Sequence, residues 1–247
     1  FVMARRRPGF IMMEPGPSAL AVVWKPLTYL SKSKIVLDIR STPVEITNHR
    51  ASLVALWFDI AMGLAKSTVN GITTLTDSMK RELCHRFRID PAFVGVFTSG
   101  VSPTLFEPRR YNGMDMRRKI GLDGKFVVFY HGNISARRGI IEAVEAVSLL
   151  KDDHPDVTFF LLGNGPAVPA VCRIAKERGI QDKVIIHDSV EYDEVPKYIA
   201  MCDVGIVPLP DLPDWRHQCP LKLLEYFSME KVAIVSDIPA HRQVAGR

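Results

Sequence analysis

Residues 219–236 read CPLKLLEYFSMEKVAIVS, a short helical pattern followed at once by a buried-looking strand at 232–236. Pro220 suits the first helical position, because its missing N–H would be unpaired there and its fixed φ is already helical. The free N–H groups of the next residues then form an anion site. A helix leading directly into a β-branched strand is typical of a parallel α/β sheet.

Two charged residues of this helix predict a ligand. Lys222 and Glu225 are three residues apart and therefore share one helix face. The ammonium would meet a diphosphate, and the carboxylate, which only accepts hydrogen bonds, could accept from both ribose hydroxyls. The pair favours a nucleotide-sugar. A core-packed amphipathic helix with solvated Lys and Glu fits the same pattern, so the rest of the chain has to decide.

Composition places the chain among ordinary globular proteins and limits its partners. It has 247 residues, 47% of them hydrophobic, which suits one large or two small domains. The net charge of +5 suits anionic partners, but acidic residues interrupt the basic ones throughout. The densest run, Arg5-Arg6-Arg7, lacks interleaved aromatic residues, so we interpret it as a solvated helix end and expect no nucleic-acid partner.

The cysteines and the apolar runs bear on the compartment. The four cysteines form no C-x-x-C pair, which suggests neither zinc nor a disulfide framework and fits a reducing cytosol. No apolar run reaches the roughly 18 residues that span a bilayer. We therefore expect a cytoplasmic protein, with a peripheral contact at the cytoplasmic membrane face as an option. The chain starts at Phe1 and stops at Arg247 within an expected helix, so we expect a fragment cut at both ends.

Short β-branched runs alternate with helical patterns along the chain, which predicts βαβ units. The first half predicts strands at 10–13, 34–39, 71–76 and 94–98, and helices at 18–30, 51–66 and, capped by Asp77, 77–87. The second half predicts strands at 125–130, 157–162, 184–187, 204–207 and 232–236, and helices at 139–150, 167–178, 193–201 and 220–229. The helix at 51–66 has apolar residues at helical spacing, namely Leu53, Leu56, Trp57, Ile60 and Leu64.

The predicted fold is α/β, with a domain over 1–107, a polar linker over 108–124 and a second domain over 125–247. Ligands of such sheets lie at the carboxyl ends of the strands. The predicted strand at 125–130 leads into YHGNISARRGI (130–140). Gly132 in this loop permits close backbone approach. Arg138 lies with Gly139 at the mouth of the next helix and could donate a forked pair of hydrogen bonds to a phosphate. An ordinary βα loop with two solvated arginines fits equally well.

Five motifs in the second half together carry a family resemblance: YHGNISARRGI, LLGNGP, CDVGIVPLP, PLKLLEYFSMEKVAIVSD and IPAHRQV. Their order and spacing resemble the donor-binding domain of the retaining glycosyltransferases with two facing Rossmann-like domains, the GT-B fold of family-4 type. The first half, with GITTLTDSMKREL and SGVSPTLFEP, is similar to the later part of that family's acceptor domain. The resemblance implies a GT-B fold with both domains incomplete.

The resemblance also implies a donor site. Gly132 would lie under the donor diphosphate, and the family's basic pair maps onto Asn133 and Arg138. The family's paired glutamates map onto His217, which departs from the pattern, and Glu225, which would bind the ribose. The whole predicted donor-binding set is Gly132, Asn133, Arg138, Gly139, Ser189, Val190, Pro220, Leu221, Lys222 and Glu225, with Ser189 and Val190 near the nucleobase.

Breaking a glycosyl phosphate bond develops negative charge on the leaving diphosphate, so Arg138 and Lys222 are the predicted catalytic residues. The resemblance implies retention of configuration, a nucleotide-sugar donor, no cofactor and no obligatory metal. The acceptor stays open: a glycan, a lipid or a small molecule. Asp38, Arg40 and His49 lie on the acceptor side without an established role. Two alternatives remain, a nucleotide-sugar epimerase of the same build and, favoured by His217, a catalytically silent nucleotide-sugar-binding subunit.

Overall fold

The computed structural model describes residues 8–15, 32–43 and 49–246. The chain divides into two compact units. Unit 1 comprises Phe1–Ser99 with Leu212–Cys219, and unit 2 comprises Gly100–Asp211 with Pro220–Arg247. The predicted helix at 18–30 and the run Arg5-Arg6-Arg7 lie outside the described residues.

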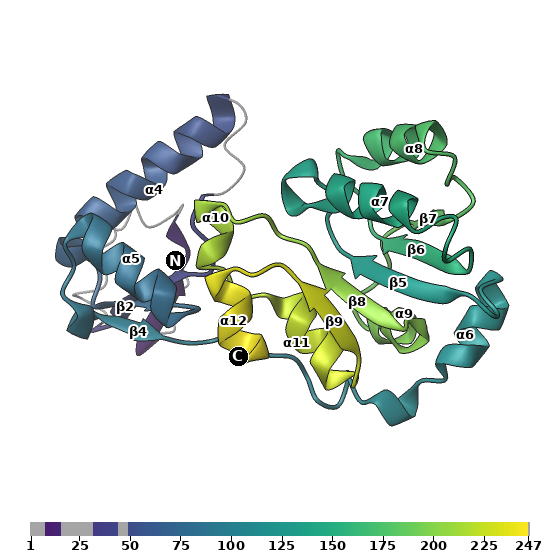
Figure 1. Cartoon of the computed structure of the whole chain (residues 1–247). Coiled ribbons are helices and arrows are strands. Elements are labelled where there is room, and N and C mark those ends of the chain that lie inside the picture. The colour runs from purple at the N-terminus through teal and green to yellow at the C-terminus, as the bar shows by residue number, and fades with distance from the viewer. Residues whose placement is uncertain (1–7, 16–31, 44–48, 247) are drawn as a thin grey trace. The chain divides into compact units, whose positions relative to one another are not determined.

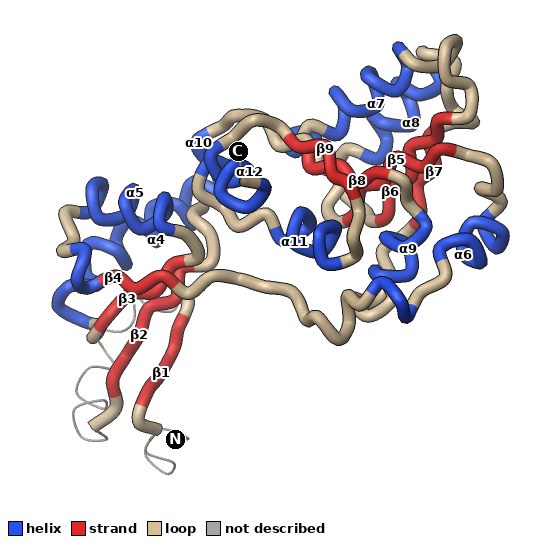
Figure 2. The backbone as a smooth tube through the Cα atoms, turned by 60° about the horizontal axis from the view of Figure 1, so that its bottom comes forward, coloured by secondary structure: helices blue, strands red, loops and turns tan. Residues whose placement is uncertain are grey.

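Unit 1 is a parallel sheet in the order β1-β2-β3-β4. Its described elements are β1 (Phe10–Met13), β2 (Lys34–Ile39), α4 (His49–Thr68), β3 (Gly71–Thr74), α5 (Asp77–Phe87), η1 (Pro91–Phe93), β4 (Val94–Val96) and α10 (Pro213–Arg216). Because the strand order follows the chain order, right-handed crossovers place α4 and α5 on the same face of the sheet, as Figures 1 and 2 show.

The helix predicted at 51–66 is confirmed as part of α4, but the apolar residues used to predict it are not its packed face. Leu53, Leu56, Trp57, Ile60 and Leu64 are exposed by 36–56%. The face packed on the sheet carries Phe58, Ala61, Met62 and Ala65. Both sets follow helical spacing, so periodicity identifies the helix and leaves the choice of packed face to tertiary contacts.

The predicted cap of α5 is wrong by one residue. Thr76, rather than Asp77, is the N-cap, and its Oγ1 accepts a hydrogen bond from the Met79 amide at 3.1 Å. Asp77 is the first helical residue, where its charge suits the positive end of the helix dipole.

Unit 2 is a parallel sheet in the order β7-β6-β5-β8-β9. Its strands are β5 (Phe126–His131), β6 (Val157–Leu162), β7 (Val184–His187), β8 (Val204–Val207) and β9 (Val232–Val235). Its helices and 3₁₀ turns are η2 (Pro108–Arg110), α6 (Gly113–Ile120), η3 (Ala136–Arg138), α7 (Ile140–Leu149), α8 (Val168–Glu177), α9 (Val195–Met201), α11 (Leu221–Ser228) and α12 (Pro239–Ala245).

The two faces of this sheet are covered differently. Helices α7 and α8 cover one face, and α9 and α11 cover the other (Figures 1 and 2). The α7 and α8 face packs mainly aliphatic side chains, such as Val144, Val171 and Leu161. The other face packs aromatic rings, with Phe129 stacked on Phe160 and edge-on to Tyr226. Strand β5 has β6 on one side and β8 on the other, so the winding of the chain reverses between β5 and β8, where such sheets bind ligands.

Two sequence interpretations in unit 2 need correction. Helix α6 lies inside the stretch 108–124 that we expected to be a linker; Asn112 caps it, and Gly121 ends it in the left-handed conformation. An added Cβ on Gly113 would lie 2.2 Å from the Ala200 carbonyl oxygen, so α6 packs tightly on α9. The strand at 232–236 is not buried: β9 is an edge strand, and Val232 and Ile234 are exposed by 69% and 61%.

Cys84, Cys172, Cys202 and Cys219 are free thiols. Among the described residues, no helix combines the length and apolarity needed to cross a membrane.

Candidate functional site

The candidate site lies at the carboxyl ends of β5 and β8 in unit 2, beside the start of α11. Residues 132–139 form the loop after β5, and Gly139 closes it in the left-handed region at φ 73°. A Cβ on Gly139 would lie 1.8 Å from the Pro208 carbonyl oxygen. Glycine is therefore required here, because the loops after the two central strands pack backbone to backbone.

The start of α11 differs from the sequence prediction by one residue. Pro220 is the N-cap, with φ −80° and ψ 76°, and Leu221 is the first helical residue. Pro220 is buried, whereas Leu221 is exposed by 42%. Proline lacks an N–H in either position. No side chain caps the first backbone amides of α11.

Lys222 lies directly against the loop after β5. A Cβ on Gly132, whose φ is 107°, would lie 3.1 Å from Lys222 Cε. The ammonium lies 5.3 Å from the centre of the Tyr130 ring and, within the described part of the chain, makes no hydrogen bond or ion pair. Burial, and next the charge of Arg138, lower the pKa of Lys222 to about 8. An anion bound here would relieve both effects.

Glu225 lies one turn further along α11 and is only 3% exposed. Its Oε1 accepts a hydrogen bond from the Tyr192 hydroxyl at 2.9 Å, and its Oε2 lies 3.1 Å from His131 Nε2. Burial acts to raise the pKa of Glu225, but the contacts with His131, then Tyr192 and Lys222, outweigh it and hold the pKa below its usual range. Burial also lowers the pKa of His131. The pair is therefore an ionised carboxylate beside a neutral imidazole.

Some of the predicted site residues interact with one another in the structure. Lys222 interacts electrostatically with Arg138 and with Glu225, and it lies against Gly132. Asn133 is exposed, and its carbonyl accepts a hydrogen bond from the Tyr130 hydroxyl at 2.8 Å. Ser189 is exposed and Val190 half-buried in the segment after β7.

Several residues with open roles belong to unit 1. His217 falls in the segment grouped with unit 1, where its carbonyl accepts a hydrogen bond from Thr76 Oγ1 at 2.8 Å. Asp38 is buried and bonds Thr73 Oγ1 at 2.7 Å and Arg40 Nε at 2.6 Å. These contacts give Asp38 and Arg40 a structural role, and the His49 side chain lies outside the described residues.

Sequence reasoning missed two side chains of this group, His131 and Tyr192. His131 ends β5 on the same face as Phe129, and its ring stacks on that phenyl ring at 5.7 Å. The alternation of strand residues was a usable signal for this face. Tyr192 had no such signal, because it lies in a loop and reaches Glu225 only through the tertiary fold.

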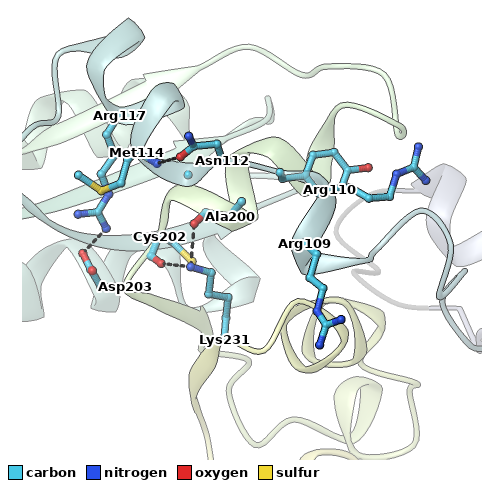
Figure 3. A pocket seen from close by; sticks show the side chains of 11 residues that line it. Arg109, Arg110, Asn112, Met114, Arg117, Ala200, Cys202, Asp203 and Lys231 are labelled. Atoms are coloured by element: carbon cyan, nitrogen blue, oxygen red, sulfur yellow. Dashed lines mark hydrogen bonds and ion pairs between the residues drawn. The ribbon is translucent and has the colours of Figure 1, made fainter.

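A cavity of about 590 Å³ lies at the opposite end of the unit 2 sheet (Figure 3). Arg117 bonds the Met201 carbonyl at 2.6 Å and pairs with Asp203 at 2.7 Å. Lys231 donates to the carbonyls of Ala200 and Cys202 at 2.7 and 2.8 Å. Arg109 and Arg110 project away from these pairs, so the basic side chains do not converge on one point (Figure 3). Among the described residues, no group of His, Cys, Asp and Glu is placed to hold a metal ion.

Comparison with protein families and curated proteins identifies relatives. The family model described as glycosyl transferases group 1 matches residues 114–247. An alpha-D-kanosaminyltransferase of Streptomyces kanamyceticus is 27% identical over 124 residues, which cover 50% of this chain and 31% of that protein. A 2-deoxystreptamine glucosyltransferase of the same organism is 28% identical over 140 residues, covering 56% and 36%. The chain thus spans about a third of the length of these curated relatives.

Solved structures share the fold. Anabaena Alr3699/HepE in complex with UDP-glucose superposes with a TM-score of 0.74 at 15% identity, covering 95% of this chain and 61% of that one. WaaG, a glycosyltransferase involved in lipopolysaccharide biosynthesis, gives a TM-score of 0.68 at 14% identity, covering 90% and 65%. Such neighbours confirm the predicted α/β architecture of the GT-B type.

Proposed function

Because the chain belongs to the glycosyl transferases group 1 family, we propose that its unit 2 binds a nucleotide-sugar and that the whole protein transfers the sugar to an acceptor. One observation carries the proposal. Two cations from separate segments, Arg138 and Lys222, interact electrostatically at the carboxyl ends of the central strands, beside the buried carboxylate of Glu225. This arrangement suits a diphosphate joined to a ribose.

The chemistry assigned to these residues is stabilisation of the leaving group. When the bond between the sugar and the diphosphate breaks, negative charge grows on the diphosphate oxygens. Fixed cations then stabilise the transition state more than the substrate. Arg138 and Lys222 supply these cations, Gly132 leaves room for the diphosphate next to Lys222, and Glu225 accepts hydrogen bonds from the ribose. From the family resemblance we infer that the transferred sugar retains its anomeric configuration.

The proposal also concerns which nucleotide-sugar is the donor and which class of molecule is the acceptor. Solved neighbours were crystallised with UDP and UDP-glucose, which supports testing uridine nucleotides first. The acceptor is a glycan, a lipid or a small molecule. The exposed apolar face of α4 keeps a peripheral membrane contact within the proposal, and co-sedimentation with anionic vesicles tests it.

Titration calorimetry of the purified chain with UDP, GDP, ADP and their sugar conjugates tests the donor site. We expect micromolar to millimolar binding of one nucleoside diphosphate and much weaker binding of the free nucleoside. Arg138→Ala should weaken the diphosphate far more than the nucleoside. If none of the nucleotides binds, the proposed function is wrong. Product analysis with a bound donor separates sugar transfer from epimerisation and from silent binding.

A further inference from the structure

Two side chains without an assigned role lie against opposite oxygens of Glu225. Tyr192 donates to Oε1 at 2.9 Å, and His131 Nε2 lies 3.1 Å from Oε2. The three residues come from separate segments: the end of β5, the loop between β7 and α9, and α11. We propose that Tyr192 and His131 are positioning residues that fix the Glu225 carboxylate and so make the site selective for ribose over deoxyribose. This inference rests on the proposed donor site.

The number of acceptor positions on the carboxylate supports a role in sugar selection. An ionised carboxylate offers about four lone-pair positions, two on each oxygen. Tyr192 occupies one position on Oε1, whereas Oε2 lies 3.1 Å from His131 Nε2 without forming a hydrogen bond among the described residues, so both oxygens keep acceptor capacity. Two vicinal ribose hydroxyls match two fixed acceptors. A deoxyribose would leave one acceptor of a buried carboxylate unpaired, which is the situation that gives strong discrimination.

Tyr192 is held in place by contacts that lead back to the helix of Glu225. Its ring lies 5.5 Å from that of Phe106. Phe106 is buried, and its carbonyl accepts a hydrogen bond from Ser228 Oγ at 3.0 Å at the end of α11. Tyr192 itself is 53% exposed, so its side chain borders both solvent and the buried carboxylate. Tyr192 therefore combines a fixed orientation with access to the site.

His131 is held by the aromatic face of the sheet. Its ring stacks on Phe129 at 5.7 Å and meets Tyr226 edge-on at 5.5 Å. These contacts fix the ring plane. A neutral imidazole holds only one proton, and His131 Nε2 lies 3.1 Å from Glu225 Oε2 without an aligned hydrogen bond among the described residues. His131 thus borders Oε2 as a fixed, neutral ring and leaves the negative charge of the carboxylate available to the ribose.

Calorimetry with matched sugars tests the inference. UDP, GDP and ADP are each titrated beside the 2′-deoxy counterpart. We expect the parent to bind a ribonucleotide roughly tenfold more tightly than its deoxy form, and Tyr192→Phe to lower that ratio by roughly threefold or more, mainly by weakening the ribonucleotide. His131→Leu should lower the ratio similarly, and His131→Gln, which keeps an N–H donor, should largely restore it.

A matched variant separates a local effect from general loss of packing. Tyr198→Phe also removes a phenol hydroxyl in unit 2, one that lies 3.3 Å from His187 Nε2, and should leave the ratio unchanged. A parent-like ratio in Tyr192→Phe would overturn the inference, as would tighter ribonucleotide binding, which would mean that Tyr192 competes with the ribose. If the parent binds no nucleotide, the proposed function fails first and this inference with it.

Discussion

The two ends of the unit 2 sheet both gather basic side chains next to a carboxylate, but they use them differently. At the end shown in Figure 3, Arg117 and Lys231 donate to backbone carbonyls, and Arg117 also pairs with Asp203. At the carboxyl ends of the strands, Lys222 lies against the Tyr130 ring and Gly132 and makes no hydrogen bond or ion pair with another described residue. The difference separates cations that bind the backbone and a carboxylate of the fold from one whose ammonium has no such partner among the described residues.

The largest expected effect comes from removing one lysine at each end. Lys222→Ala should weaken UDP binding by about 1.5–3 kcal/mol and leave free uridine unchanged, because only the diphosphate loses a charged partner. Lys231→Ala should instead lower the free energy of unfolding by about 1–3 kcal/mol, because two carbonyls lose their donor, and leave binding unchanged. Calorimetry and urea denaturation measure the two effects. Similar effects of both variants would remove the distinction between the ends.

Glu225→Gln should have the next largest effect. A neutral amide keeps the shape of the side chain but loses the charge that strengthens hydrogen bonds from the ribose, so binding should weaken by about 1.5 kcal/mol. Unlike Lys222→Ala, this change should weaken uridine and UDP alike, since both contain the ribose. Calorimetry with both ligands makes the comparison. Unaltered nucleoside affinity would exclude Glu225 from the site.

The elements of the sheet were predictable because their signals are local. The strands β6, β7 and β8 coincide with the predicted runs, which are short, β-branched and bounded by turn residues. The edge position of β9 was not predictable in this way, because a continuous apolar run looks the same in a central strand and in an edge strand. The packed face of α4 was missed for the same reason: both of its faces are apolar at helical spacing.

The candidate site was predictable only where one segment carries the signal. Lys222 and Glu225 share one turn of α11, and the structure places Gly132 against Lys222. Whether these residues bind a donor stays a prediction. The contacts of Tyr192 and His131 with Glu225 join residues 33 and 94 positions apart in the chain, which no spacing rule reveals. Such contacts arise from the strand order of the sheet.

The pH dependence of UDP binding is a further test of the role of Lys222. Lys222 in the empty site has its pKa lowered to about 8, and a bound diphosphate favours its charged form. Raising the pH through 8 therefore removes the proton that the ligand needs, and UDP affinity should fall about tenfold between pH 7 and pH 9. Lys222→Arg should bind UDP without this fall, because a guanidinium stays charged. A slope that persists in this variant would assign the titration to another group.

The smallest expected effect concerns the backbone beside Lys222. Gly132 and Gly124 both have positive φ, 107° and 70°, so either Gly→Ala change should lower the free energy of unfolding by about 1 kcal/mol or more. Only at Gly132 would the new Cβ meet a side chain, Lys222 Cε at 3.1 Å; at Gly124 it meets nothing within 4 Å. Gly132→Ala should therefore also weaken UDP binding, by roughly twofold to threefold, since the flexible lysine can adjust its rotamer. Because the strain is common to both variants, the ratio of their UDP affinities isolates the contact with Lys222. Equal UDP affinities of the two variants would show that UDP binding by Lys222 does not depend on the open space beside Gly132.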